Sequence, residues 1–75
     1  MVYSSIFKIG EEVYFIFKEN DEVIVRKDKI KEIYITENEV LYVLENYYGG
    51  RAREDELIAV KYDYELKDKI IQLFN

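Results

Sequence analysis

The feature that most constrains the fold is a run of five apolar residues at positions 13–17 (VYFIF). Every residue in the run is β-branched or aromatic, which favours a strand over a helix. A strand with one solvated face alternates apolar and polar residues, whereas an uninterrupted apolar run is typical of a strand covered on both faces. We therefore expect residues 13–17 to form a strand that is buried from two sides.

Turn motifs divide the surrounding sequence into further strands. The polar stretch at residues 19–22 (ENDE) predicts a tight turn that makes a hairpin with the apolar run. A second polar stretch at residues 37–39 (ENE) predicts another turn, and Gly49-Gly50 ends the strand that follows it. The predicted elements are a hairpin over residues 11–27, in which residues 23–25 begin the second strand, strands over 29–36 and 40–48, and a short strand over 51–53.

The strand predicted over residues 29–36 has an irregular hydrophobic pattern. Ile30, Ile33 and Ile35 are its candidates for the core. The step of three residues from Ile30 to Ile33 breaks strict alternation, so we expect a β-bulge near residues 31–32. In the next strand we expect Val40, Tyr42 and Leu44 on one face, and Leu41 and Val43 on the other.

Beyond residue 63 the hydrophobic spacing becomes helical. Leu66, Ile70, Ile71, Leu73 and Phe74 recur at that spacing. We expect a helix over residues 63–74 with Asp63 as its N-cap, packed on the strands because a helix this short is marginal alone. The predicted fold is mostly β: a single domain over residues 1–75, in which an SH3-like antiparallel barrel of about five strands (residues 7–62) precedes the helix. The alternative is an open antiparallel sheet with the helix on one face.

Four short motifs carry a resemblance to a known group. They are residues 7–14 (FKIGEEVY), 29–38 (KIKEIYITEN), 42–44 (YVL) and 50–57 (GRAREDEL). In this order they resemble small uncharacterised proteins of Gram-positive phages and prophages. The resemblance implies an SH3-like barrel and a phage-like origin, and it brings no catalytic residue with it.

Composition excludes most catalytic chemistry. The 75-residue chain has no Cys and no His, so it lacks a thiolate, a disulfide and the commonest general base and metal ligand. The hydroxyls of Ser4, Ser5 and Thr36 have no imidazole to activate them. We expect no enzymatic activity, no cofactor and no metal site.

The charge balance narrows the range of partners. The net charge of −5 argues against nucleic acids and anionic membrane surfaces. The sequence has no apolar run near the ~18 residues that span a bilayer, and residues 1–10 lack the pattern of a signal peptide. The expected location is the cytoplasm of a bacterial or infected host cell.

Residues 47–53 (YYGGRAR) are the strongest candidate for a ligand or partner site. Aromatic faces, a backbone that permits close approach and two guanidinium groups suit a nucleotide or phosphate ligand, or the centre of a protein interface. A structural interpretation stands beside this one: a Gly-Gly turn, tyrosines in the core, and arginines paired with Glu54 and Glu56. The candidate residues are Tyr47, Tyr48, Gly49, Gly50, Arg51 and Arg53.

Two charged sets are the other candidates. A basic stretch over residues 26–31 could follow a nucleic-acid backbone weakly, or could protect an edge strand from aggregation. Carboxylates displayed on a rigid fold could imitate the phosphates that a nucleic-acid-binding protein recognises, or could only keep the protein soluble. The basic residues are Arg26, Lys27, Lys29 and Lys31, and the acidic ones are Glu11, Glu12, Glu19, Asp21, Glu22, Glu37, Glu39 and Glu45.

These observations favour a non-catalytic binding module. The leading hypothesis is a phage-type accessory protein that recognises a host protein, for example as an inhibitor of a bacterial defence nuclease. The alternatives are a nucleotide or phosphate binder using residues 47–53, and a weak nucleic-acid adaptor. We also expect a homo-oligomer, because residues 13–17 offer more apolar surface than one short helix covers.

Overall fold

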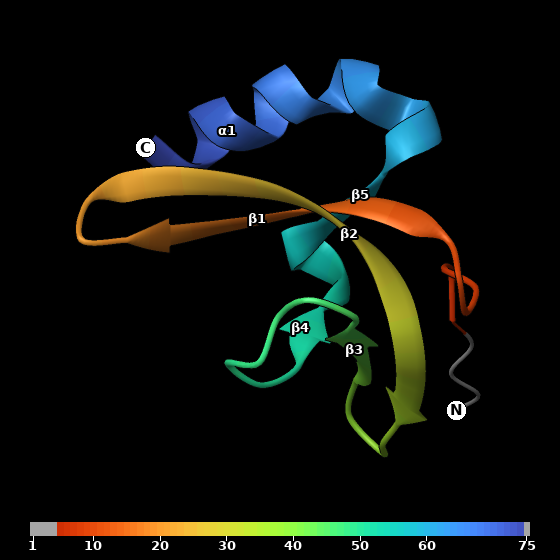
Figure 1. Ribbon diagram of the computed structural model, residues 1–75. Helices are drawn as coiled ribbons and strands as arrows, with labels where there is room; N and C mark the ends of the chain where they lie inside the picture. The colour runs from red at the N-terminus through yellow and green to blue at the C-terminus, as the bar shows by residue number, and fades with distance from the viewer. Residues whose placement is uncertain (1–4, 75) are drawn as a thin grey trace.

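A computed structural model describes residues 5–74 of the chain (Figure 1). Five strands form an antiparallel sheet in the order β4-β3-β2-β1-β5. Two 3-10 helices, η1 and η2, and one α-helix, α1, are the remaining elements of the fold. In chain order the elements are β1 (Glu12–Glu19), β2 (Glu22–Ile35), β3 (Val40–Leu44), β4 (Ala52–Arg53), η1 (Glu54–Glu56), β5 (Leu57–Ala59), η2 (Val60–Glu65) and α1 (Leu66–Phe74).

The hairpin predicted over residues 11–27 is confirmed. β1 and β2 pair from Glu12↔Lys29 to Glu19↔Glu22. Asn20 and Asp21 form the turn with φ of 51° and 66°. Two consecutive positive φ values are what a two-residue hairpin turn matching the strand twist requires, and Asn and Asp tolerate them.

β2 is one strand of 14 residues, so the prediction that the hairpin ends at residue 27 and a separate strand covers residues 29–36 is wrong. Its first part pairs with β1 and its last part pairs with β3, because the strand bends between the two ladders (Figure 1). The register shifts between Ile30 and Glu32, which confirms the predicted bulge. A bulge adds local twist and lets one strand serve both ladders.

The apolar run at residues 13–17 is covered on both faces, as predicted. Val13 and Phe15 belong to the main core with Tyr42, whereas Ile16 is buried on the other face, where α1 packs (Figure 1). The apolar surface that motivated a homo-oligomer is therefore covered within the chain, and the oligomeric state stays a prediction. Val40, Tyr42 and Leu44 are buried on one face of β3, as expected.

Other expectations need correction. β3 ends at Leu44, short of residue 48, because the chain leaves the sheet there. β5 was not predicted, since Leu57–Ala59 is too short for periodicity to reveal it.

The C-terminal helix is shorter than predicted. α1 begins at Leu66, and Asp63 lies within η2. Ile35 is exposed at the end of β2, and Ile71 and Phe74 are exposed on α1.

The closed barrel is not found in the described residues. β4 pairs with β3 alone and β5 pairs with β1 alone, so these two strands are the ends of the sheet. α1 lies over the β1–β2 hairpin (Figure 1). Between residues 5 and 74, no helix is both long enough and apolar enough to cross a membrane.

Candidate functional site

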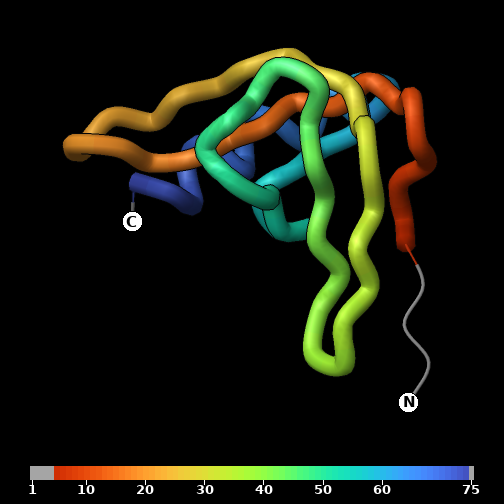
Figure 2. The backbone as a smooth tube through the Cα atoms, turned by 60° about the horizontal axis from the view of Figure 1, so that its bottom comes forward, coloured from red at the N-terminus to blue at the C-terminus, as the bar shows by residue number. Residues whose placement is uncertain are grey.

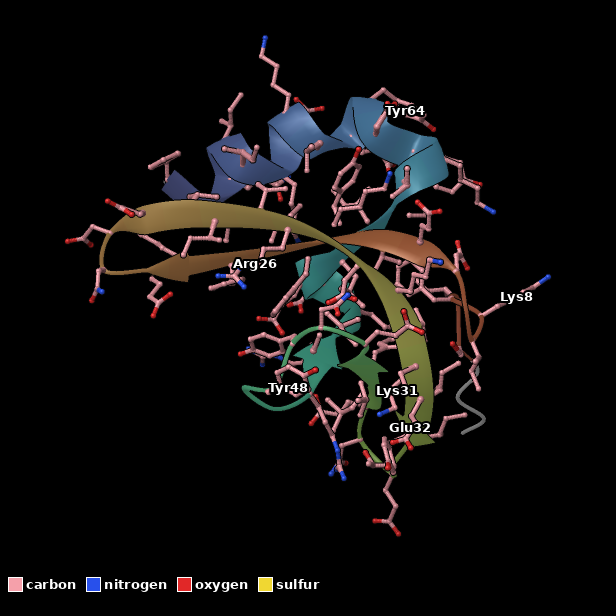
Figure 3. All side chains as sticks on the ribbon, in the orientation of Figure 1. Lys8, Arg26, Lys31, Glu32, Tyr48 and Tyr64 are labelled. Atoms are coloured by element: carbon pink, nitrogen blue, oxygen red, sulfur yellow. The ribbon has the colours of Figure 1, made fainter. Side chains whose placement is uncertain are left out.

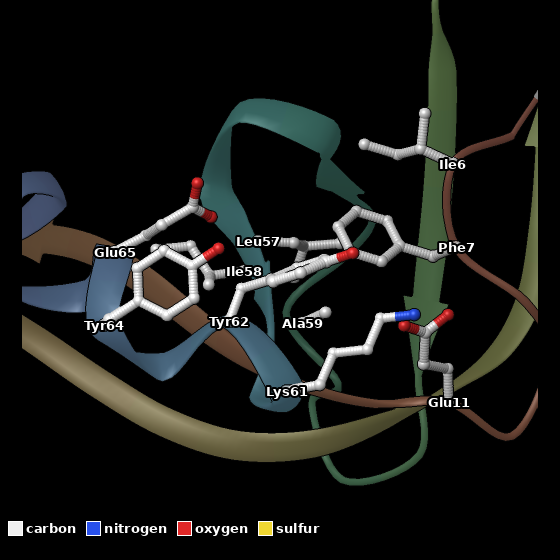
Figure 4. Close-up of a pocket in the computed structure, with 10 residues that line it drawn as sticks. All are labelled: Ile6, Phe7, Glu11, Leu57, Ile58, Ala59, Lys61, Tyr62, Tyr64 and Glu65. Carbon is white, nitrogen blue, oxygen red and sulfur yellow. The ribbon is translucent and has the colours of Figure 1, made fainter.

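A pocket of about 590 Å³ lies between the N-terminal segment, β5 and η2 (Figure 4). Leu57, Ile58 and Ala59 of β5 are buried and form its apolar floor. We call this pocket the tyrosine groove. Its lining residues are Ile6, Phe7, Glu11, Leu57, Ile58, Ala59, Lys61, Tyr62, Tyr64 and Glu65.

The N-terminal segment forms one wall of the tyrosine groove and is held in place by β3. The Phe7 ring packs edge-on against Tyr42, with centroids 5.3 Å apart. The Ser5 hydroxyl lies 3.0 Å from the Tyr42 hydroxyl, which donates to Glu54 at 2.6 Å. These contacts fix the backbone on either side of Ile6, whose side chain stays 68% exposed at the rim.

η2 supplies the other wall. Its backbone kinks at Tyr62, where φ is −111° and ψ is 38°. The rings of Tyr62 and Tyr64 pack edge-to-face at 6.0 Å and 83°. Both remain exposed, Tyr64 to 72%. Two large aromatic rings thus lie at the solvent boundary above an apolar floor.

The charged groups lie at the two ends of the groove (Figure 4). At one end, the Lys61 ammonium is 5.3 Å from the centroid of the Tyr62 ring, and Glu11 accepts a hydrogen bond from the backbone N–H of Lys8 at 3.0 Å. Glu65 lies at the other end. Within residues 5–74, Glu65 has no cationic partner inside 4.0 Å.

The chemistry of the groove suits binding. Its apolar floor and aromatic wall favour apolar side chains, and its charged ends can orient them. Across residues 5–74, no group of three or more His, Cys, Asp and Glu side chains could hold a metal ion.

The 47–53 loop, the leading sequence candidate, lies elsewhere. Tyr47 packs edge-on against Phe15 at 4.7 Å and near Phe17 at 6.2 Å, so its half-buried ring packs against the core. Its hydroxyl folds over Gly49, where an added Cβ would lie 2.5 Å away. Gly50 turns the chain with φ of 127°. Tyr48 is 92% exposed.

The two arginines of this loop have partners within the chain. The Arg51 guanidinium lies 4.1 Å from the centroid of the Tyr34 ring. The hydrogen bond that Tyr34 donates to Glu32, and then the charge of Glu32, raise the pKa of Tyr34. Arg53 pairs with Glu56 at 3.9 Å, as the structural interpretation predicted. Arg51 therefore stacks on an aromatic ring, and among residues 5–74 it has no carboxylate within 4.0 Å.

The basic stretch is divided between the two faces of β2. Arg26 pairs with Phe15 and Lys27 with Tyr14, so their side chains point to opposite faces. Lys27 forms an ion pair with Glu12 at 3.2 Å. Lys29 shares the face of Lys27, and Lys31 lies at the bulge. β2 is the third of five strands in the sheet order, but Arg26, Lys27 and Lys29 lie in the part that pairs with β1 alone. The edge-strand interpretation therefore stays a prediction for these residues.

The acidic candidates are spread over several places. Asp21 and Glu22 lie at the β1–β2 turn, and Glu37 and Glu39 lie at the β2–β3 turn, which projects in another direction (Figure 2). Glu11 lines the tyrosine groove and Glu12 begins β1. These carboxylates do not form one continuous surface.

Sequence reasoning missed Tyr62, Tyr64 and Ile6. A usable signal was present in residues 62–64 (YDY), where two tyrosines stand beside a predicted helix start and fit neither a strand nor a helix pattern. Comparison of the chain with protein-family models, curated proteins and solved structures found no match. The resemblance to phage proteins therefore stays a prediction.

Proposed function

We propose that this chain is a non-catalytic binding module that recognises another protein through the tyrosine groove. One observation carries the proposal: the exposed, mutually perpendicular rings of Tyr62 and Tyr64 lie over the buried apolar floor of β5. Tyrosine is enriched in the residues that dominate protein interfaces, since it buries a large area with few rotatable bonds.

The exposed side chains around the groove support a macromolecular partner. Ile6, Tyr62 and Tyr64 are 68%, 44% and 72% exposed, and all three line one pocket. Grouped apolar exposure of this kind is typical of an interaction site, whereas single exposed apolar residues are ordinary. A protein partner would cover these side chains and remove that surface from water.

The fold gives this surface a rigid base, and we propose that it is of the SH3-like class in a half-open form. Three observations support this assignment: β2 bends to join two ladders, η1 alone connects β4 to β5, and β5 returns to pair with β1. Backbone amide contacts between β4 and β5, measured by NMR, test whether the two end strands approach one another as in a closed barrel.

Affinity capture tests the binding function. The immobilised protein is exposed to bacterial lysate beside a Tyr62→Ala/Tyr64→Ala variant and a Tyr48→Ala control. The control removes an even more exposed tyrosine from a different surface. We expect a stoichiometric protein to be retained by the wild type and the control. Loss of one interface hot spot of about 2 kcal/mol lowers affinity about thirtyfold, so the groove variant should release the partner.

Retention by the groove variant, or loss with Tyr48→Ala alone, would contradict the proposal. The narrower hypothesis of a phage accessory protein that inhibits a defence nuclease depends on the identity of the retained protein. A captured nuclease whose activity falls on adding this chain would support it, and a captured protein of another class would refute it.

A further inference from the structure

The tyrosine groove does not end at Tyr64. A second pocket of about 340 Å³ adjoins it and shares two lining residues, Ile58 and Glu65. This second pocket runs along the side of α1, where Asp68, Lys69 and Gln72 complete its lining. The two pockets are therefore adjacent, and we call the pair, from Ile6 to Gln72 on α1, the trough.

The trough changes chemistry along its length. The part over β5 is apolar and aromatic, whereas the part along α1 carries the carboxylates of Glu65 and Asp68. These two residues are three positions apart, so they lie on the same face of the helical segment. Neither has a cation within 4.0 Å among residues 5–74. Lys69 lines the same pocket, so carboxylates outnumber ammonium groups there by two to one.

The cation nearest the aromatic part does not offset these carboxylates. Lys61 lies over the ring of Tyr62, and Figure 4 shows its ammonium at the Glu11 end of the groove. The free charge at the Glu65 end is therefore negative, in a chain whose net charge is −5. A complementary occupant carries a positive group at this end and an apolar group over β5.

We infer that the trough takes a segment of the partner protein in which an apolar or aromatic side chain stands next to a Lys or Arg, an inference that rests on the proposed function. The apolar side chain packs between Ile6 and the two tyrosines. The basic side chain reaches the carboxylates of Glu65 and Asp68. Nucleic acid is disfavoured here, because its phosphates would meet those carboxylates.

The absence of Trp from this chain makes the inference directly measurable. The probe is the peptide acetyl-Gly-Trp-Leu-Lys-Arg-Gly-amide, whose tryptophan is excited selectively and reports its own burial. The matched control peptide has Glu in place of both basic residues. We expect saturable binding of the basic peptide that weakens as salt is added, and binding of the acidic peptide at least about tenfold weaker.

Two protein variants complete the design. Glu65→Gln/Asp68→Asn removes the trough carboxylates, and Glu37→Gln/Glu39→Gln makes the same charge change at the β2–β3 turn. The first variant should bind the basic peptide about fivefold more weakly, since an exposed ion pair contributes up to about 1 kcal/mol. Its affinity should also depend less on salt concentration. The second should leave the affinity within about twofold.

The outcomes separate the inference from the proposed function. Equal binding of both peptides, no saturable binding of the basic peptide, or no effect of Glu65→Gln/Asp68→Asn beyond a lower melting temperature would each overturn the inference. The proposed function would still stand if the partner captured from lysate is lost with Tyr62→Ala/Tyr64→Ala. If the captured partner is also insensitive to the groove tyrosines, both proposals fail.

Discussion

The 47–53 loop and the tyrosine groove contain similar residue types in different surroundings. Each has two tyrosines and a cation near an aromatic ring. In the loop, Tyr47 packs against the core and Arg53 pairs with a carboxylate. In the groove, Tyr62 and Tyr64 pack on one another and stay exposed. Figure 3 shows Tyr48 and Tyr64 on different sides of the β1–β2 hairpin.

This difference teaches that a motif becomes a binding site only where the fold leaves its side chains without partners. The aromatic and basic residues of the loop are mostly engaged within the chain, so the motif that looked functional in the sequence is largely structural. The groove tyrosines pack on one another, stay exposed and lie over an apolar floor. Their free surface is available to a partner.

The largest expected effect is a difference in unfolding free energy between a variant of the loop and a variant of the groove. Tyr47→Ala should lower the free energy of unfolding by about 2 kcal/mol, less than the ~3–5 kcal/mol of a fully buried aromatic, because Tyr47 is half-buried against Phe15. Tyr64→Ala should change it by less than about 0.5 kcal/mol. Urea denaturation of both variants measures the two losses of unfolding free energy. Equal losses would contradict the structural difference between loop and groove.

The next effect tests how the groove wall is anchored. Tyr42→Phe keeps the buried ring but removes the hydroxyl between Ser5 and Glu54. We expect a loss of about 1.5 kcal/mol, because the hydrogen bond has a carboxylate acceptor. Proton-exchange rates of the backbone amides of residues 5–7 should rise more than those of the 47–53 loop. Equal changes in both regions would refute this anchoring role.

The stability difference between wild type and Tyr42→Phe should also depend on pH. Burial, and then the hydrogen bond to Glu54, raise the pKa of Tyr42 above its ordinary value of about 10. A phenol whose pKa is raised in the folded state stabilises the fold fully below its unfolded pKa and loses that contribution as pH rises through the folded pKa. The difference between the two proteins should therefore shrink as pH rises above 10, as chemical denaturation at each pH can measure.

A smaller effect is expected at Gly49. An added Cβ would lie 2.5 Å from the Tyr47 hydroxyl, so Gly49→Ala should cost about 1 kcal/mol as the Tyr47 ring moves aside. In a Tyr47→Ala background this cost should disappear, because the clashing ring is absent. A double-mutant cycle by urea denaturation measures the coupling. Equal costs in both backgrounds would contradict this explanation.

The smallest effect concerns the phosphate-ligand hypothesis for the loop. Arg51 stacks on Tyr34 and Arg53 pairs with Glu56, and the two therefore do not form a ready fork for a phosphate. We expect no change in melting temperature with millimolar nucleotide, since a ligand stabilises only to the extent that it binds the folded state. A rise in melting temperature that Arg51→Ala abolishes would support the hypothesis that the loop binds a phosphate ligand.

Much of the fold could be predicted from the sequence. The double-sided burial of residues 13–17, the hairpin turn at Asn20 and Asp21 and the bulge near Lys31 follow from local residue patterns. The continuity of β2 could not be predicted, because the charged residues at 26–28 resemble a break. β5 is fixed by its pairing with β1, a contact between distant segments that periodicity does not record.

The candidate site was much less predictable. The sequence gives no measure of exposure, so the tyrosines of the 47–53 loop and those at positions 62 and 64 look alike. Their difference arises because Tyr47 packs against Phe15, whereas the backbone kinks at Tyr62, whose ring extends toward Phe7 while Tyr64 lies near Glu65 (Figure 4). Both events depend on tertiary packing.

Site-specific photo-crosslinking tests most directly whether the partner contacts the tyrosine groove. A benzophenone amino acid is placed at position 64 in one protein and at position 48 in another, and each is irradiated in bacterial lysate. Our account predicts a discrete adduct from position 64 and none from position 48. An adduct from position 48 with none from position 64 would contradict it.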